Sequence, residues 1–148
     1  MLTDPSYVVN YRARDGRSSA GDTTSEWIAP AFKEIFRVLK PDRFCVSFYG
    51  WNVADVFMTA WRKAGFQPVG HIVWVKPYVS NQRFLRYQHE QAYLLAKGQP
   101  QTPSFPLKDV LRWDYTGNKL HPTQKPVSAL RLLIGAFSKR GDMVRWVH

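Results

Sequence analysis

The sequence predicts an α/β fold, in which helices pack on a layered, mainly parallel sheet. Three observations support this prediction. The first two are that apolar residues recur at helical spacing in three segments and that short, continuously apolar runs lie before and between them. The third observation is their order, strand, helix, strand, helix, strand, strand, helix, which suits right-handed crossovers between parallel strands. The 148 residues show no internal repeat and no domain boundary, so residues 1–148 are expected to form one domain.

The first predicted helix follows a very short apolar run, Leu2–Thr3. Thr24 or Ser25 is expected to cap this helix, and Lys40-Pro41-Asp42 ends it. The positions that predict its buried stripe are Ile28, Ala31, Phe32, Ile35, Phe36 and Leu39.

A buried strand and a second helix come next. Residues 43–49 are rich in Phe and Val, which predicts a strand buried on both faces, and Gly50 ends it. The second helix is expected to start at Asn52, with Gly65 in its C-terminal cap position. Its apolar stripe is formed by Val53, Val56, Phe57, Ala60, Trp61 and Ala64.

Two further strands are predicted at His71–Val75 and Glu90–Ala96, each bounded by Gly or Pro. Residues 99–118 are irregular in pattern, with a short structured turn expected near residues 110–113. This connection is too long to serve only as a linker.

The last helix is predicted from the residues at its start. Thr123 is expected to cap it, and Pro126 lies in the first turn, where a missing amide hydrogen costs little. Its buried stripe is Leu130, Leu133, Ile134 and Phe137. Met143–Val147 then looks like the start of a strand without a predicted neighbour.

Composition limits the class of protein and of partner. A net charge of +10 favours a polyanion, although basic charge also serves solubility. No run approaches the roughly 20 apolar residues of a membrane helix, and no secretory leader precedes Asp4. The single Cys45 is expected to be a buried free thiol in a reducing compartment, most simply cytoplasm, and no metal site is predicted.

The turn Asp4-Pro5-Ser6-Tyr7 follows the first apolar run, where ligands of open α/β sheets bind. Two interpretations of this segment are open: an ordinary proline turn, or a catalytic site. In the second reading, a carboxylate and a proline carbonyl accept both hydrogens of an amino group, and the tyrosine ring stacks on a base. Two fixed acceptors would pull the amine towards tetrahedral geometry and localise its lone pair for attack on a methyl group.

Three sequence segments resemble motifs of a known family. They are Leu2-Thr3-Asp4-Pro5-Ser6-Tyr7; Gly70–Pro77 together with Glu90–Gly98; and Leu120-His121-Pro122-Thr123-Gln124-Lys125-Pro126. The chain resembles the DNA amino-methyltransferases that use S-adenosylmethionine, in the group whose Asp-Pro-Pro-Tyr motif comes first and whose cofactor loop comes last. The resemblance implies a partial Rossmann-like methyltransferase sheet, mostly parallel with one antiparallel strand and with helices on both faces. It also implies DNA methylation, of the kind found in restriction-modification, in a prokaryotic or mobile-element setting.

The resemblance also implies roles for individual residues. Asp4 and the Pro5 carbonyl would hold the amine of a flipped base, adenine by analogy, and Tyr7 would stack on that base. The residues implied to lie against the amino-acid end of the cofactor are Asp4, His121, Thr123 and Lys125. The first turn of a helix with a lysine beside it can bind the carboxylate of the cofactor. The same residues are also compatible with an ordinary capped helix that binds nothing.

Candidate contacts to double-stranded DNA lie in two places. Arg83, Arg86 and Tyr87 form a basic, aromatic cluster that reads equally as a solvated loop. Lys108 and Arg112 lie in residues 99–118, where this group often places its target-recognition segment.

The sequence departs from the family pattern at two points. Ser6 replaces the second proline, which loosens the turn. No glycine-rich cofactor loop follows Gly141-Asp142. The resemblance therefore predicts a truncated or degenerate member that binds S-adenosylmethionine feebly or not at all, as calorimetric titration tests.

Other readings remain open. The missing strands would leave an apolar sheet edge, open to self-association or complementation by another chain. The alternatives to a DNA methyltransferase are a noncatalytic DNA-binding or partner-binding module and a methyltransferase that acts on RNA or a protein amide.

Overall fold

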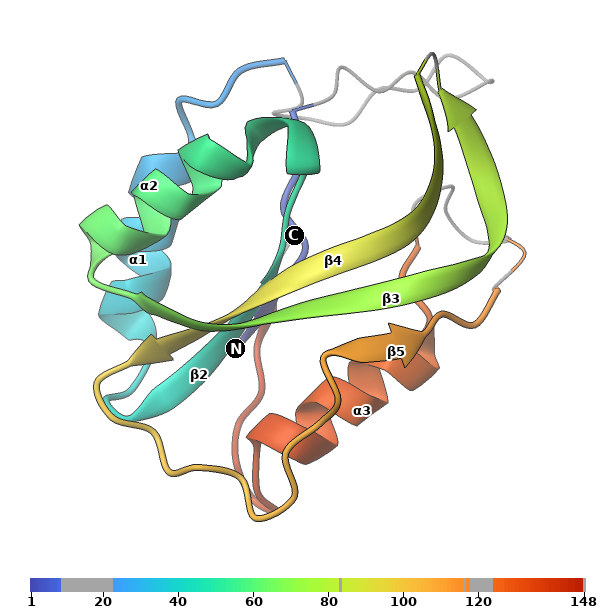
Figure 1. The fold of residues 1–148 in the computed structure, drawn as a ribbon. Helices are drawn as coiled ribbons and strands as arrows, with labels where there is room; N and C mark the ends of the chain where they lie inside the picture. Colours follow the sequence, from blue (N-terminus) through green and yellow to red (C-terminus); the bar gives the residue numbers. More distant parts are fainter. Residues whose placement is uncertain (9–22, 83, 116, 118–123, 148) are drawn as a thin grey trace.

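The computed structural model describes residues 1–8, 23–82, 84–115, 117 and 124–147 of the chain. These residues form one six-stranded sheet in the order β5-β3-β4-β2-β1-β6 (Figure 1). Its strands are β1 (Leu2–Thr3), β2 (Arg43–Phe48), β3 (Gln67–Gln82), β4 (Leu85–Lys97), β5 (Val110–Arg112) and β6 (Trp146–Val147).

One strand, β4, runs against all the others. It pairs antiparallel with β2 and β3, whereas β1 is parallel to β2 and β6, and β3 is parallel to β5. The structure therefore confirms the predicted sheet, mostly parallel with one antiparallel strand.

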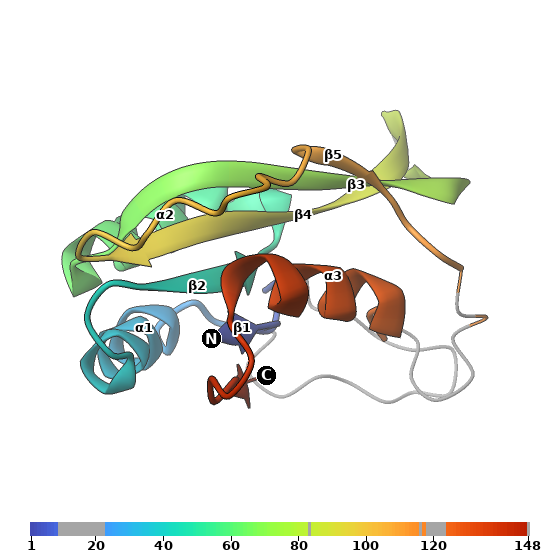
Figure 2. The ribbon, with the colours of Figure 1, turned by 90° about the horizontal axis from the view of Figure 1, so that it is seen from below.

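Helices cover both faces of this sheet, as predicted. The helices α1 (Ile28–Val38) and α2 (Ala54–Ala64), the latter preceded by the 3₁₀ turn η1 (Trp51–Val53), pack on one face. Helix α3 (Val127–Phe137) packs on the other face, beneath β3 and β4 in Figure 2.

Two apolar cores result from the alternation of side chains along β2 and β4. The core under α1 and α2 is rich in aromatic rings packed edge to face, and its main members are Ile28, Phe32, Cys45, Phe57, Trp61 and Leu95. The core under α3 is built on Leu2, Val46, Phe48, Trp74, Ala92 and Leu133. β2 contributes to both, which explains its continuous apolar sequence.

The helix ends differ in part from the predictions. Gly65 ends α2 with a left-handed φ of 104°, as predicted. The N-cap of α1 is Trp27 without a side-chain cap, so the predicted capping by Thr24 or Ser25 is wrong; instead the Ser25 carbonyl accepts a hydrogen bond from the Ile28 amide at 3.1 Å. Pro126 lies at the N-cap of α3, one position before the first turn, and Thr123 lies outside the described residues.

The strands also differ from the predicted lengths. β3 and β4 are far longer than His71–Val75 and Glu90–Ala96, because they continue as a paired arm beyond the last β2 pair, Phe48 with Ala92, and β5 joins this arm only over Val73–Val75. The short structured piece near residues 110–113 is a parallel strand beside β3. The strand predicted to start in Met143–Val147 has a neighbour, contrary to the prediction, because β6 pairs with β1.

Lys97 closes the C-terminal end of α1. Its ammonium donates to the carbonyl oxygens of Phe36 and Leu39, each at 2.6 Å, and lies 4.5 Å from the centroid of the Phe36 ring. These carbonyls are among the unpaired acceptors at the end of the helix, and hydrogen bonds from a charged donor are worth about 1.5–3 kcal/mol each.

We expect Lys97→Met to lower the free energy of unfolding by about 2 kcal/mol, because the last carbonyls of α1 lose their donor. Urea denaturation followed by circular dichroism measures this loss. Lys33→Met, at an exposed position on the same helix, is the matched control and should change stability by less than about 0.5 kcal/mol. Equal effects of the two substitutions would contradict the capping role.

Candidate active site

The candidate site lies where β1 and β2 end side by side. Thr3 pairs with Ser47 in parallel register, so Asp4 leaves the sheet at the same edge as Phe48. This is the edge at which open α/β sheets bind ligands. Pro5 is buried and Tyr7 is half-buried against the α3-side core, so the turn is packed and does not extend into solvent.

An ion pair joins this turn to the start of α3. Asp4 Oδ1 lies 3.0 Å from Lys125 Nζ and accepts a hydrogen bond from the Tyr7 hydroxyl at 3.3 Å. The side chains of Lys125 and Asp4 are only 5% and 16% exposed. The chain thus brings together two charges separated by about 120 positions in a site largely closed to water.

Two aromatic rings surround the lysine ammonium. Lys125 Nζ lies 5.0 Å from the centroid of the Tyr7 ring and 5.2 Å from that of Phe48. Such contacts stabilise a cation through the negative faces of the rings. The site therefore accommodates positive charge by means of both a carboxylate and ring faces.

The acid groups of the site have shifted pKa values. Burial raises the pKa of Asp4, and the Lys125 ammonium opposes this rise. Burial, then the negative charges of Asp4 and Glu90, raise the pKa of Tyr7 well above its usual value. The Tyr7 hydroxyl therefore keeps its proton and remains a hydrogen-bond donor to Asp4.

A second ion pair lies beside the first. Lys76 Nζ on β3 is 3.4 Å from Glu90 Oε1 on β4, and their side chains are 10% and 22% exposed. Sequence analysis did not assign either residue to the site. The alternation of side chains along the two strands could have identified them. Lys76 lies on the same face of β3 as the buried Ile72 and Trp74, and Glu90 lies on the same face of β4 as the buried Ala92.

Gly50 allows the two strand ends to approach closely. A Cβ atom on Gly50 would lie 2.5 Å from the Tyr7 carbonyl oxygen and 2.9 Å from Tyr7 Cβ, so the backbones of the two loops are in direct contact. Asn52 adds a hydrogen bond from its Nδ2 to the Val8 carbonyl oxygen at 3.4 Å. The loop after β2 therefore positions the Asp4–Tyr7 turn.

We expect Gly50→Ala to lower stability by about 1–3 kcal/mol, because the added methyl group displaces the Tyr7 backbone. Thermal unfolding measures this effect. Gly135→Ala is the control, since a Cβ there meets no atom within 4 Å and alanine favours the helix. An unfolding temperature of Gly50→Ala at or above that of the parent chain would contradict the close approach.

The predicted site residues fall into separate groups. Asp4, Pro5, Tyr7 and Lys125 come together in one site. His121, Thr123 and Arg83 lie outside the described residues. Of the other predicted DNA contacts, Arg86 is exposed and Tyr87 half-buried on the β3–β4 arm, while Lys108 and Arg112 are exposed before and on β5.

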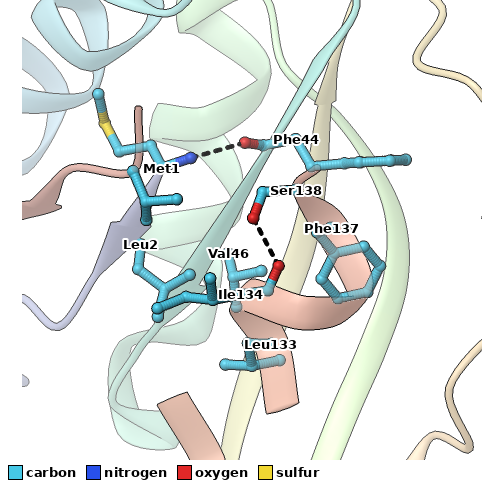
Figure 3. A pocket seen from close by; sticks show the side chains of 9 residues that line it. Met1, Leu2, Phe44, Val46, Leu133, Ile134, Phe137 and Ser138 are labelled. Carbon is cyan, nitrogen blue, oxygen red and sulfur yellow. Dashed lines mark hydrogen bonds between the residues drawn. The ribbon is translucent and has the colours of Figure 1, made fainter. Parts of the chain in front are cut away.

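A small hollow lies at the opposite end of β1 (Figure 3). It has a volume of about 20 Å³, sufficient for one water molecule, and Leu2, Phe44, Leu133 and Phe137 are among the apolar residues that line it. It is too small for a nucleotide or a cofactor and belongs to the packing of α3 on β1 and β2.

Two other kinds of feature are absent from the part of the chain that the structure describes. It contains no group of three or more His, Cys, Asp or Glu side chains arranged to hold a metal ion. None of its helices is long and apolar enough to cross a membrane.

Comparison with solved structures identifies the fold. A crystal structure of M1.HpyAVI in complex with SAM matches 98% of this chain and 69% of its own, with a TM-score of 0.68 and 20% identity. A second structure of M1.HpyAVI matches 98% of this chain and 65% of its own, with a TM-score of 0.64 and 16% identity. The fold is thus the α/β fold of Rossmann-like methyltransferases.

The model of the DNA methylase family matches residues 1–145, and the chain belongs to this family. The protein named "Putative methylase YubD" of Escherichia coli (strain K12) is 55% identical over 144 residues, which are 97% of this chain. The chain spans 63% of the length of that relative. The predicted family resemblance is confirmed.

Proposed function

We propose that this chain takes part in the transfer of a methyl group from S-adenosylmethionine to the exocyclic amine of a flipped base in DNA, with adenine N6 as the target. The observation that carries the proposal is the convergence of Asp4, Tyr7 and Lys125 at the carboxyl end of β1. Membership of the DNA methylase family supports it.

The described residues fit the amino-acid end of the cofactor. That end carries an ammonium, a carboxylate and a sulfonium, and the site offers a carboxylate, a buried ammonium and two ring faces. Asp4 and Lys125 already pair at 3.0 Å. The bound amino-acid end of the cofactor would replace this ion pair by two others, one between its ammonium and Asp4 and one between its carboxylate and Lys125. The start of α3 adds backbone amides that favour a carboxylate.

Asp4 and the Pro5 carbonyl are proposed to accept the two hydrogens of the target amine. When bound, S-adenosylmethionine supplies an electrophilic methyl group. The amine nitrogen forms a bond to this methyl group as the carbon–sulfur bond breaks, and the nitrogen then loses one proton. The Asp4 carboxylate stabilises the positive charge that develops on the nitrogen, and its raised pKa makes it a better proton acceptor than an exposed aspartate.

Tyr7 is proposed to hold the base by stacking. Its hydroxyl donates to Asp4 and so fixes the orientation of both side chains. Extrusion of a base costs a few kcal/mol, which stacking on an aromatic face offsets in part.

Double-stranded DNA is the proposed partner, in the cytoplasm. The net charge of +10 and the exposed Arg86, Lys108 and Arg112 support contacts to phosphates, and residues 99–118 are the proposed target-recognition segment.

β6 is proposed as the place where a second chain would complement the sheet, since Trp146 and Val147 on this outer strand are 41% and 38% exposed.

The decisive experiment incubates the chain with methyl-labelled S-adenosylmethionine and duplex DNA, and then identifies the labelled nucleoside. The proposal expects label in N6-methyladenine. Label in N4-methylcytosine would overturn the assignment of the target. Salt-sensitive DNA retention without any transfer would instead identify a noncatalytic DNA-binding module.

A further inference from the structure

An exposed aromatic pair lies next to the candidate active site. Trp51, the first residue of η1, stacks on Tyr87 of β4, with ring centroids 5.3 Å apart and an angle of 20° between the planes. Trp51 remains 56% exposed, although one of its faces is covered by the tyrosine. An indole left open to solvent is costly to hydrate, whereas it is well suited to stack on another planar ring.

The backbone fixes this pair beside the Asp4–Tyr7 turn. Trp51 directly follows Gly50, where an added Cβ atom would lie 2.5 Å from the Tyr7 carbonyl oxygen, and Asn52 donates a hydrogen bond to the Val8 carbonyl oxygen. Tyr87 lies three positions before Glu90, whose charge contributes to the pKa shifts of Asp4 and Tyr7. Both members of the pair are therefore held by segments that also position the site.

The β3–β4 arm carries Tyr87, one member of the pair, beyond the end of β2. β2 pairs with β4 only from Phe48 to Arg43, so Tyr87 belongs to the part of β4 that extends past the sheet edge (Figure 1). Arg86, next to Tyr87, is exposed on this arm. The open aromatic face suits the planar bases of a nucleic-acid strand, and Arg86 adds an exposed cation to the same arm for its phosphates.

We propose that Trp51, backed by Tyr87, is a stacking site for an unpaired DNA base that neighbours the base held at Asp4 and Tyr7. The inference rests on the proposed function in one respect, namely that DNA is the partner. When one base leaves the duplex, each neighbouring base loses a stacking partner on one face. The Trp51 indole, supported by the Tyr87 ring, can stack on such an exposed face.

The test compares two single-stranded DNA probes of equal length, about 12 nucleotides: one of mixed sequence and one whose sugars carry no bases. Fluorescence anisotropy measures the affinity of the 148-residue chain for each probe. The parent chain should bind the base-bearing probe more tightly. Trp51→Ala should weaken binding of that probe about 5- to 100-fold, and leave binding of the baseless probe within about twofold.

Three controls sharpen the result. Trp51→Phe keeps an aromatic face and should retain most of the affinity. Met143→Ala removes a large apolar side chain that is 84% exposed outside the proposed DNA contacts, and it should change the affinity for neither probe. Urea unfolding of Trp51→Ala should match the parent chain, since the indole is largely exposed.

Equal weakening for both probes, or no weakening for either, would overturn the stacking site. Absence of any preference of the parent chain for the base-bearing probe would do the same. Failure of the proposed function is seen separately, as absence of methyl transfer to duplex DNA. Base-dependent binding that requires Trp51, without transfer, would leave the inference intact and remove only the catalytic proposal.

Discussion

Asp4→Ala is expected to lower the rate of methyl transfer to DNA on the order of 10²- to 10³-fold or more, because the target amine loses its charged acceptor. The developing positive charge on the nitrogen would then face a methyl group in place of a carboxylate. DNA affinity should change little, since the predicted phosphate contacts lie elsewhere, on the β3–β4 arm and around β5. Initial rates with labelled cofactor, together with anisotropy for binding, separate the two effects.

Two further variants test whether this loss is specific to the Asp4 carboxylate. Tyr7→Phe keeps the ring and removes the hydroxyl that donates to Asp4 at 3.3 Å, so transfer should fall by less than about tenfold. Asp55→Ala removes an exposed carboxylate on α2 and should leave transfer unchanged. A rate for Asp4→Ala within a few-fold of the parent rate would refute the role assigned to the turn.

Lys125→Met is expected to lower the free energy of unfolding by about 3–5 kcal/mol at neutral pH, because it leaves the Asp4 carboxylate buried without its cation. For a chain of this length that corresponds to a decrease of roughly 10 °C in the unfolding temperature. The double variant Asp4→Asn/Lys125→Met removes both charges and should recover most of the loss. Urea denaturation of the parent, single and double variants measures the coupling.

The loss should depend on pH in a defined direction. Burial raises the pKa of Asp4, and removal of Lys125 takes away the largest opposing influence, so the folded-state pKa rises further. The folded chain then binds a proton that the unfolded chain releases, and stability falls as the pH rises from about 4 through the folded pKa. The deficit of Lys125→Met should therefore be smaller near pH 4.5 than at pH 7.5, and a deficit that does not change with pH would contradict this account.

The sequence predicted the α/β layers and the order of the helices and strands because apolar periodicity is a local property. It predicted Gly65 as a helix end for the same reason. It did not predict the length of β3 and β4, since residues of the arm such as Tyr87 pair with only one neighbouring strand and carry no buried alternation. The pairing of β6 with β1 was also missed, because strands at the two ends of the described chain share no local signal.

The candidate site was predicted only in part. Asp4 and Lys125 were each identified from motifs, but their 3.0 Å contact depends on the packing of α3 against β1, which no sequence pattern expresses. Glu90 and Lys76 were overlooked because a charge in a strand normally indicates an exposed position. Trp51 was overlooked as well, since its partner Tyr87 lies 36 positions away and only the fold brings the rings together.

The pairing of Leu2 with Trp146 has a consequence for the evolution of such chains. Because the first and last described strands are parallel neighbours, the sheet does not depend on which of them is translated earlier. A gene rearranged to encode α3 and β6 ahead of β1 would need only a connection that returns along one strand to build the same layers. We therefore expect such a rearranged chain to keep Asp4 and Lys125 in contact.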